Sequence, residues 1–408
     1  MIVGNAATSV SNRRLRRHGL MLGAALTASL VLSACGSSAP SGTSSSSNAV
    51  SSSNAGGSSG AGASSATSAG GVDVAAAQKV VDKYSSAPTK INQTTALTKS
   101  VPTGKSVIFA NSGLPATQLI VGGAKEAVES LGWSFDTVSY ENANPSTLQA
   151  ALMTALSKKP SAVIISGNNP ATYGAGTLEA YVAAGVPLIV GSVCPLTVAA
   201  PLVAGGAGCE QEKAAGTAFA NWFIADSNGT GKALFVNVKA IPALAAFVTA
   251  FSDEVKAKCS TCAVDVLEAT LDQVTQNQIV PAAVNKLRTD PSYNYLLFDN
   301  AQFSKGVLPA LSAAGLESKV KVGGRSVDEA ALGALKDGTE AAWTAVPYNV
   351  VGYSAVDYLL RNMVGEAAGD PLVLPFQIVT SKNAADLTAP YRLPADALDQ
   401  YKKIWGVS

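Results

Sequence analysis

The sequence has a single histidine, His18, among 408 residues. Only 14% of the residues are charged and 6% are aromatic, and 29 basic residues balance 28 acidic ones to a net charge of +1. A chain without excess positive charge has no electrostatic means of attracting nucleic acid, so we expect no nucleic-acid partner. Because His18 falls in a segment that we expect to be removed, catalytic triads with a histidine base and histidine-ligated zinc are excluded. The composition therefore favours a binding protein without metal or cofactor over an enzyme.

The amino terminus has the pattern of an export signal. A basic cluster at residues 13–17 precedes the apolar run 20–32, which is too short to span a bilayer and ends in Leu32-Ser33-Ala34-Cys35. This ending resembles the bacterial lipoprotein signal, whose cysteine becomes the lipid-modified first residue. We therefore predict a signal peptide at residues 1–34 and a lipid on Cys35, with a retained membrane anchor as the alternative.

Residues 36–71 consist almost entirely of serine, glycine and alanine and carry no charge. Such a segment buries too little apolar surface to offset its ordering entropy, so residues 35–71 are predicted to be a lipidated, flexible tether. Residues 72–104 are expected to hold an amphipathic helix over 74–84, packed against the first lobe, and a lead-in to the folded body.

From residue 105 onward, short apolar runs alternate with longer segments of helical period. Strands are predicted at 106–111, 134–140, 162–166, 187–192, 233–237, 263–268, 295–299 and 319–323. Helices are predicted at 117–131, 147–158, 172–184, 210–226, 242–258, 276–288 and 305–314. Strands as apolar as Val163-Ile164-Ile165 are typical of parallel sheets with helices on both faces. The predicted fold is α/β, with two tandem doubly wound (Rossmann-like) parallel-sheet lobes.

Polar residues recur where the predicted strands end. Three strands end in Phe-x-Asn, at Asn111, Asn237 and Asn300, and two others end in 166–169 (Ser-Gly-Asn-Asn) and 190–192 (Val-Gly-Ser). Asparagine and glycine also suit turns, which is the alternative at any one position. Ligands of such sheets bind at the carboxyl ends of the strands. Together the five ends predict a cleft of uncharged hydrogen-bonding groups that holds a small polar solute.

Three segments of the first lobe and one of the second carry a family resemblance. They are Lys105-Ser-Val-Ile-Phe-Ala-Asn111, Gly122-Gly-Ala-Lys-Glu-Ala-Val128, Ala184-Gly-Val-Pro-Leu-Ile-Val190, and 285–300 with Asp290-Pro291 before a strand. In order and spacing they resemble the ribose-type (type I) periplasmic binding proteins of ABC importers, over roughly residues 105–379. The lactose-repressor-type regulators share this fold, but an export signal stands here in place of their DNA-binding helices, which favours transport.

The resemblance implies the solute-binding subunit of an ATP-driven importer, extracytoplasmic and monomeric, whose closed form docks on the membrane permease. Three crossovers are expected at 201–206, 345–348 and 374–380. Lobe 1 would then contain residues 105–203 and 347–373. Lobe 2 would contain residues 207–344 and 376–408, with a closing helix at 394–404. Hinge closure on the solute would shift the population from open to closed.

Several positions depart from the sugar-binding pattern of that family, although Asn300 matches it. Leu114-Pro115 replace aromatic residues, Ser192-Val193 an acidic residue, Gly324-Arg325 an aspartate, and Ala345 a glutamine. These departures argue against a plain pentose and favour a sugar-like solute. One option is a solute with an anionic group, which would pair with Arg325. A solvated loop arginine or an inter-lobe salt bridge is the alternative for Arg325. The predicted ligand-binding residues are Asn111, Ser112, Gln118, Asn168, Asn169, Ser192, Lys239, Gln273, Asn300, Phe303, Arg325 and Tyr348.

Four cysteines remain besides Cys35, and an even count in an exported chain favours disulfides. Cys194 and Cys209 flank the segment that leads into the first crossover, so a bridge between them would hold the edge of the hinge. Cys259 and Cys262 form a CxxC pair after the helix 242–258. Reactive thiols favour helix amino termini, so a structural disulfide is the preferred interpretation there. A four-cysteine zinc site lacks a second CxxC pair.

Two functions from other classes stay open at this point. One is a thiol-disulfide oxidoreductase that uses Cys259 and Cys262. The other is a ligand-sensing subunit of a surface receptor, which shares the fold and the ligand chemistry of a transport protein.

Overall fold

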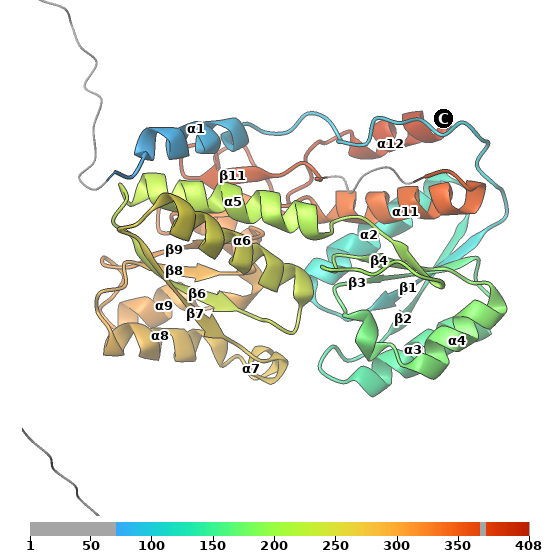
Figure 1. Ribbon diagram of the computed structural model, residues 1–408, viewed down its shortest axis with the longest axis horizontal. Coiled ribbons are helices and arrows are strands. Elements are labelled where there is room, and N and C mark those ends of the chain that lie inside the picture. Colours follow the sequence, from blue (N-terminus) through green and yellow to red (C-terminus); the bar gives the residue numbers. More distant parts are fainter. Residues whose placement is uncertain (1–70, 368–372, 408) are drawn as a thin grey trace, which may run out of the picture. The chain divides into compact units, whose positions relative to one another are not determined.

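A computed structural model describes residues 71–367 and 373–407 and is shown in Figure 1. The predicted signal peptide, Cys35 and the tether up to residue 70 lie outside the described residues. No helix in the described part of the chain combines the length and the apolar character needed to cross a membrane.

Lobe 1 is built on a parallel sheet of five strands. In spatial order these are β2 (Ser134–Ser139), β1 (Ser106–Asn111), β3 (Ala162–Ser166), β4 (Leu188–Gly191) and β5 (Leu202–Ala204). Helices α2 (Pro115–Ser130) and α11 (Tyr348–Val364) cover one face, and α3 (Pro145–Ser157) and α4 (Ala175–Ala184) cover the other (Figure 1).

The alternation of side chains along β1 shows why this sheet has a layer of helices on each of its two faces. Val107 and Phe109 point into the core formed with α2 and α11, whereas Ile108 and Ala110 point into the core formed with α3 and α4. Because successive residues of a strand face opposite sides, a strand that is apolar throughout requires a helix layer on each face. The predicted doubly wound lobe is confirmed.

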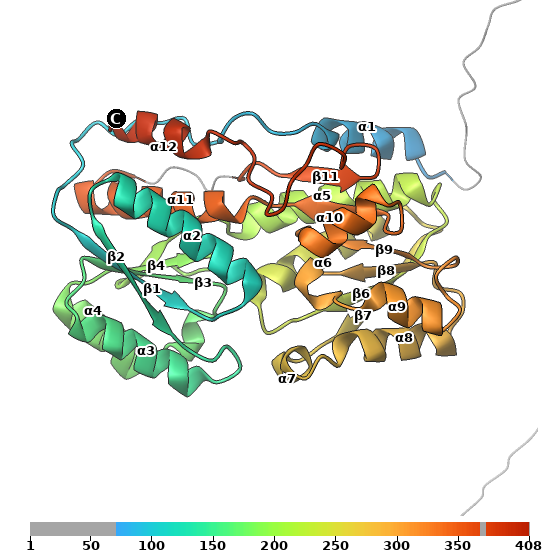
Figure 2. The same cartoon turned by 180° about the vertical axis from the view of Figure 1, so that it is seen from behind.

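Lobe 2 is built on a sheet of six strands, all parallel except the edge strand β11. In spatial order these are β11 (Gln377–Thr380), β10 (Ala342–Ala345), β9 (Lys321–Gly324), β8 (Tyr295–Phe298), β6 (Lys232–Asn237) and β7 (Ala263–Glu268). One face packs against α1 (Val74–Ser85), α5 (Cys209–Asp226) and α6 (Pro242–Lys258). The other packs against α8 (Ile279–Thr289), α9 (Val307–Ala313) and α10 (Glu329–Lys336), seen in Figure 2. The short α7 (Leu271–Thr275) precedes α8.

Each lobe contains one helix pair in which glycine permits a very close approach. A Cβ atom on Gly123 of α2 would lie 2.2 Å from the carbonyl oxygen of Asn349 in α11, and one on Gly352 of α11 would lie 2.4 Å from the carbonyl oxygen of Ile120. In lobe 2, a Cβ on Gly216 of α5 would lie 2.5 Å from the carbonyl oxygen of Phe247 in α6. These glycines therefore set the helix spacing, which any larger side chain would increase.

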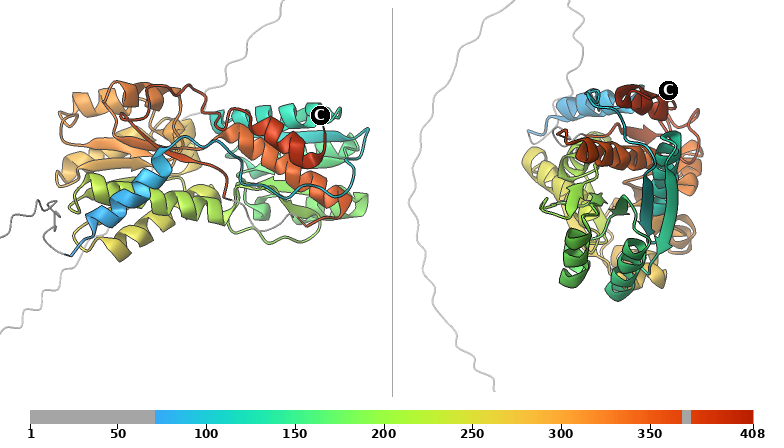
Figure 3. Two further views of the ribbon diagram at one scale, coloured as in Figure 1. Left: turned by 90° about the horizontal axis from the view of Figure 1, so that it is seen from above. Right: turned by 90° about the vertical axis from the view of Figure 1, so that its right-hand side faces the viewer.

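Both terminal helices pack against the lobe opposite to the one expected. Helix α1 contributes Ala77 and Val81 to the core of lobe 2, and Tyr84 stacks on Phe376 with ring centroids 4.5 Å apart. The prediction that it packs against lobe 1 is wrong. Helix α12 (Ala397–Trp405) lies along α11 (Figure 3) and buries its apolar face in the core of lobe 1, although residues 376–408 were expected in lobe 2.

Between the described helices and strands, the chain consequently passes from one lobe to the other five times. Three are the expected crossovers, between β5 and α5, between β10 and α11, and between α11 and β11. Two of their predicted ranges, 201–206 and 374–380, also contain the short strands β5 and β11, which periodicity did not reveal. The two additional connections run from α1 to β1 and from β11 to α12.

Candidate functional site

The carboxyl end of β1 brings three of the predicted residues together. Asn111 is 9% exposed, its Oδ1 accepts the backbone N–H of Gly113 at 2.9 Å, and its Nδ2 donates to Oε1 of Gln118 at 3.3 Å. The hydroxyl of Ser112 donates to that of Thr117 at 2.9 Å. The turn and the first turn of α2 thus fix these amide and hydroxyl groups in place before any solute arrives.

The loop after β3 is tied to the loop after β2. The hydroxyl of Tyr140 donates to Oδ1 of Asn168, and Nδ2 of Asn168 donates to Oδ1 of Asn142 at 3.3 Å. Burial raises the pKa of Tyr140, so its hydroxyl remains protonated at physiological pH. Sequence reasoning missed Tyr140 and Asn142, although Tyr140 ends a predicted strand and Asn142 follows it. Asn169 caps the short 3-10 helix Pro170–Thr172.

In lobe 2, two buried oxygen atoms at strand ends have no donor among the described residues. Asn237 donates through Nδ2 to Glu268 at 3.2 Å, but its Oδ1 is unpaired. Asp299 accepts the N–H of Val238 through Oδ2, and its Oδ1 is unpaired. Burial raises the pKa of Asp299 to about 7, against the opposing effects of the Val238 bond and Arg325. Sequence reasoning missed Asp299 and Glu268, since each looks like an ordinary polar residue at a strand end.

Arg325 is held by a buried carboxylate of lobe 2. Its Nε and Nη2 donate to the two carboxylate oxygens of Glu212 at 2.7 and 2.6 Å. Its Nη1 donates to Ser326 Oγ at 2.8 Å and to the hydroxyl of Tyr348 at 3.3 Å. Asn300 donates to the same hydroxyl at 2.9 Å. The expected pairing of Arg325 with an anionic solute is therefore disfavoured, because four of the five N–H groups of its guanidinium already donate to Glu212, Ser326 and Tyr348.

Two further predicted residues, Phe303 and Gln273, have structural roles, whereas a third, Lys239, does not. Phe303 is 6% exposed and belongs to the hydrophobic core of lobe 2. Gln273 forms a capping box with Thr270 at the start of α7. Lys239 is exposed in the loop after β6. Phe303 also lines one of the cavities between the lobes.

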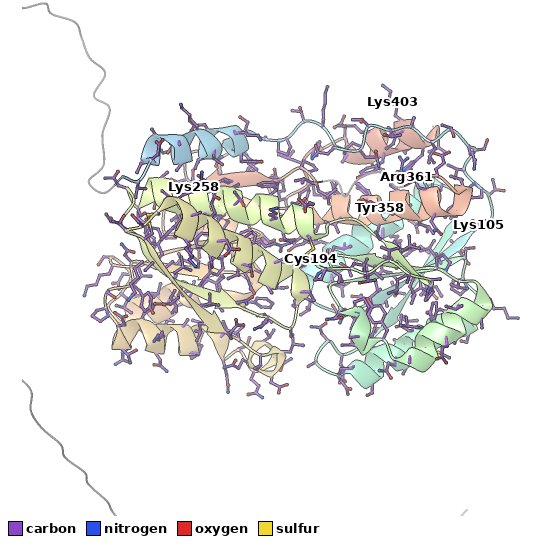
Figure 4. All side chains as sticks on the ribbon, viewed as in Figure 1. Lys105, Cys194, Lys258, Tyr358, Arg361 and Lys403 are labelled. Atoms are coloured by element: carbon purple, nitrogen blue, oxygen red, sulfur yellow. A yellow bond between two sulfur atoms is a disulfide. The ribbon has the colours of Figure 1, made fainter. Side chains whose placement is uncertain are left out.

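Both disulfides are present. Cys194–Cys209 links the loop after β4 of lobe 1 to the first residue of α5 in lobe 2, across the first crossover (Cys194 is labelled in Figure 4). Ser192, at the same strand end, has a left-handed backbone with φ of 54°. Cys259–Cys262 lies within lobe 2, and Cys259 is 2% exposed at the carboxyl terminus of α6. That position gives a thiolate neither solvent access nor support from the helix dipole.

Four cavities are lined by residues of both lobes. Their volumes are about 630, 120, 790 and 520 Å³. The predicted residues among their walls are Asn169, Lys239, Gln273, Asn300, Phe303 and Tyr348. Asn111, Ser112, Gln118, Asn168, Ser192 and Arg325 do not line these four cavities. The space between the lobes is thus accessible from several sides, next to the strand ends. Within residues 71–367 and 373–407, no cluster of three or more metal-ligating side chains could hold a metal ion.

Two tandem doubly wound lobes, with polar strand ends and cavities between them, have the architecture of a two-lobed binding protein of the periplasmic class. Residues 106–367 match the sequence family described as periplasmic binding protein domain, and the chain belongs to that family. Members of this family act outside the cytoplasm and bind small solutes. No curated protein matches the sequence.

Several solved structures share this fold. A glucose-galactose binding protein from Geobacillus stearothermophilus aligns with a TM-score of 0.59 at 18% identity, covering 69% of this chain and 99% of its own. An arabinose binding protein from the same organism aligns at 0.56 and 19% identity, covering 71% and 100%. A solute binding protein from Burkholderia graminis in complex with D-arabinose aligns at 0.58 and 18% identity, covering 71% and 99%.

Proposed function

We propose that this protein is the solute-binding subunit of an ABC importer and that it binds a small, neutral, polyhydroxylated solute between its lobes. We further propose that a lipid on Cys35 anchors it to the outer face of the cell membrane and that it delivers the solute to a membrane permease as a monomer.

The observation that carries this proposal is the pair of unpaired acceptors in lobe 2, Oδ1 of Asn237 and Oδ1 of Asp299. A buried acceptor without a donor costs about 1–3 kcal/mol, which a ligand hydroxyl would recover. Asn111 and Asn168 supply amide groups from lobe 1. Because Glu212 neutralises Arg325, the charge of this guanidinium is not available to an anionic solute, which favours a neutral solute over an anionic one.

The names of the structural neighbours agree with this solute class, since two are described as glucose-galactose and arabinose binding proteins. The missing aromatic side chains near the first strand favour a solute that differs from those sugars. The hydroxyl of Tyr348, at the start of α11, receives hydrogen bonds from Asn300 and Arg325 of lobe 2. This contact joins the second crossover to two strand ends, so solute binding there would be coupled to the hinge.

The test is a thermal-shift screen of the full chain against neutral hexoses, pentoses, polyols and disaccharides, with uronic acids and sugar phosphates as charged counterparts. A ligand that binds only the folded state raises the melting temperature with concentration. We expect one neutral compound to do so. Asn300→Ala should weaken its binding by about tenfold or more, since the removed amide contributes about 1–3 kcal/mol. Asn362→Ala, on the exposed side of α11, is the matched control and should bind normally. No shift with any neutral compound at millimolar concentration would contradict the proposal.

A further inference from the structure

The cavity of about 630 Å³ differs from the strand ends in its chemistry. Its walls are mostly apolar and come from α9 and α10 of lobe 2, the start of α2 of lobe 1, and the segment 389–391. Figure 2 shows these three helices on the same side of the molecule. We call it the α9–α10 cavity. Neither Asn111 nor Asn237 lines it.

A buried carboxylate, Glu340, is part of this apolar wall. Glu340 is 7% exposed, and its Oε2 accepts the indole N–H of Trp343 at 2.6 Å. Among the described residues no donor reaches its other carboxylate oxygen, so one oxygen is held by the protein and one is left for a ligand. Burial raises the pKa of Glu340 to about 7, the Trp343 bond opposes this rise, and Asp328 adds to it. A nearby cation would relieve this cost of burial.

The other polar groups of the cavity also favour a cation. Asp328 and Glu329 line it together with Glu340, whereas Lys305 is the only basic residue among the described residues that line it. Gln302, which lines it too, has a buried Oε1 without a donor among the described residues. The cavity therefore offers unpaired acceptors and an excess of negative charge on an apolar surface. That combination suits a hydrogen-bond donor with a positive charge and an apolar body.

We infer that the α9–α10 cavity is a second binding site, which takes an organic ammonium ion with an apolar body and pairs its charge with Glu340. The site extends the proposed function, because it lies beside the strand ends and shares Asn300, Ser326 and Tyr348 with them. A bound amine would contact Pro115 or Leu119 of lobe 1 as well as lobe 2.

The experiment uses the full chain labelled with ¹⁵N at about pH 8, where Glu340 is ionised and alkylamines are protonated. The probes are n-hexylamine and 2-phenylethylamine, with n-hexanol, 2-phenylethanol and hexanoate as matched compounds that lack the positive charge. The indole N–H signal of Trp343, assigned with Trp343→Phe, reports on the carboxylate that it contacts. We expect this signal to shift saturably at millimolar amine and not with the alcohols or hexanoate.

Two kinds of variant test the pairing. Glu340→Gln keeps an acceptor for Trp343 and should weaken amine binding by about tenfold or more, the effect of losing one charge-assisted contact. Leu119→Lys and Leu119→Glu change one exposed wall position of α2 and form a matched pair. The lysine variant should weaken binding and the glutamate variant should preserve it.

Three results would overturn the inference: no shift with either amine, equal shifts with the alcohols, or amine binding that survives Glu340→Gln. Titration with the neutral sugar panel is run on the same variants. If the sugars fail to bind while the amines do, the proposed function falls and this site stands.

Discussion

The guanidinium of Arg325 and the carboxylate of Glu212 form a bidentate ion pair although 113 residues separate them. Glu212 lies in the first turn of α5, directly after the first crossover, and Arg325 follows β9. Their side chains are 1% and 6% exposed. The pair therefore connects the beginning of one crossover helix to the strand ends of lobe 2, and through Tyr348 to the second crossover.

Glu212→Gln should lower the free energy of unfolding by about 3–5 kcal/mol, because it leaves a buried guanidinium without its counter-ion. Urea denaturation measures the loss. The matched control is Asp357→Asn, which breaks the equally buried Asp357–Arg361 pair within α11 (Arg361 is labelled in Figure 4). Both variants should lose stability, but only Glu212→Gln should also weaken solute binding. Equal solute affinity in the two variants would show that the Glu212 pair has no role at the hinge.

The disulfide Cys194–Cys209 spans two lobes, whereas Cys259–Cys262 lies within one. Replacing both cysteines of the first pair by serine should cost about 3 kcal/mol of stability, the loop-closure value for a separation of 15 residues. It should also increase the radius of gyration of the solute-free protein in X-ray scattering. The double serine variant of Cys259 and Cys262, separated by 3 residues, should lose less stability and keep its dimensions. An unchanged radius of gyration in the first variant would mean that the bridge does not limit opening.

Asp299 should make the protein less stable as the pH rises. Its pKa in the folded state is about 7, above the ordinary value of 3.8, so the folded state binds the proton more tightly than the unfolded state. This contribution to stability is complete below about pH 4 and is lost as the pH rises to about 7. Asp299→Asn imitates the protonated form and should reduce the decline measured by urea denaturation between these pH values. The pKa of Glu340 is raised in the same direction, so part of the decline in stability should remain in this variant. A steeper decline in Asp299→Asn would contradict this assignment.

The closing helix α12 should be essential for the stability of lobe 1. Trp405 is 2% exposed, and its indole N–H donates to the buried carboxylate of Asp357 at 2.8 Å. Trp405→Ala should therefore cost about 3–5 kcal/mol, as for other large core residues. Ile404→Ala, at a half-buried position of the same helix, is the control and should cost clearly less. Similar losses in the two variants would indicate that α12 does not belong to the core of lobe 1.

The layers of the fold could be predicted because each strand carries its own signal. A run such as Val163-Ile164-Ile165 is apolar on both faces, so it specifies two helix layers without reference to the rest of the chain. The partner of a terminal helix has no such local signal. Ala397, Tyr401 and Trp405 lie on one face of α12 and predict that this face is buried, but not which lobe buries it.

The candidate site was predictable only where a polar residue ends a strand. Asn111 and Asn300 were found in this way, because their position follows from the periodicity of one segment. Arg325 was also predicted to bind the solute, but its ion pair with Glu212 could not be predicted, since only folding brings Glu212 within hydrogen-bonding distance. Asp299 differs from an ordinary turn residue through its burial and its unpaired oxygen, and neither property is visible in the sequence.

The most direct test of the central claim is isothermal titration calorimetry of the full chain with the neutral sugar and polyol panel, followed by chemical analysis of the recovered compound. We predict saturable binding of one solute molecule per chain and recovery of that solute unchanged. Absence of binding by every neutral compound, or recovery of a chemically altered product, would contradict the account.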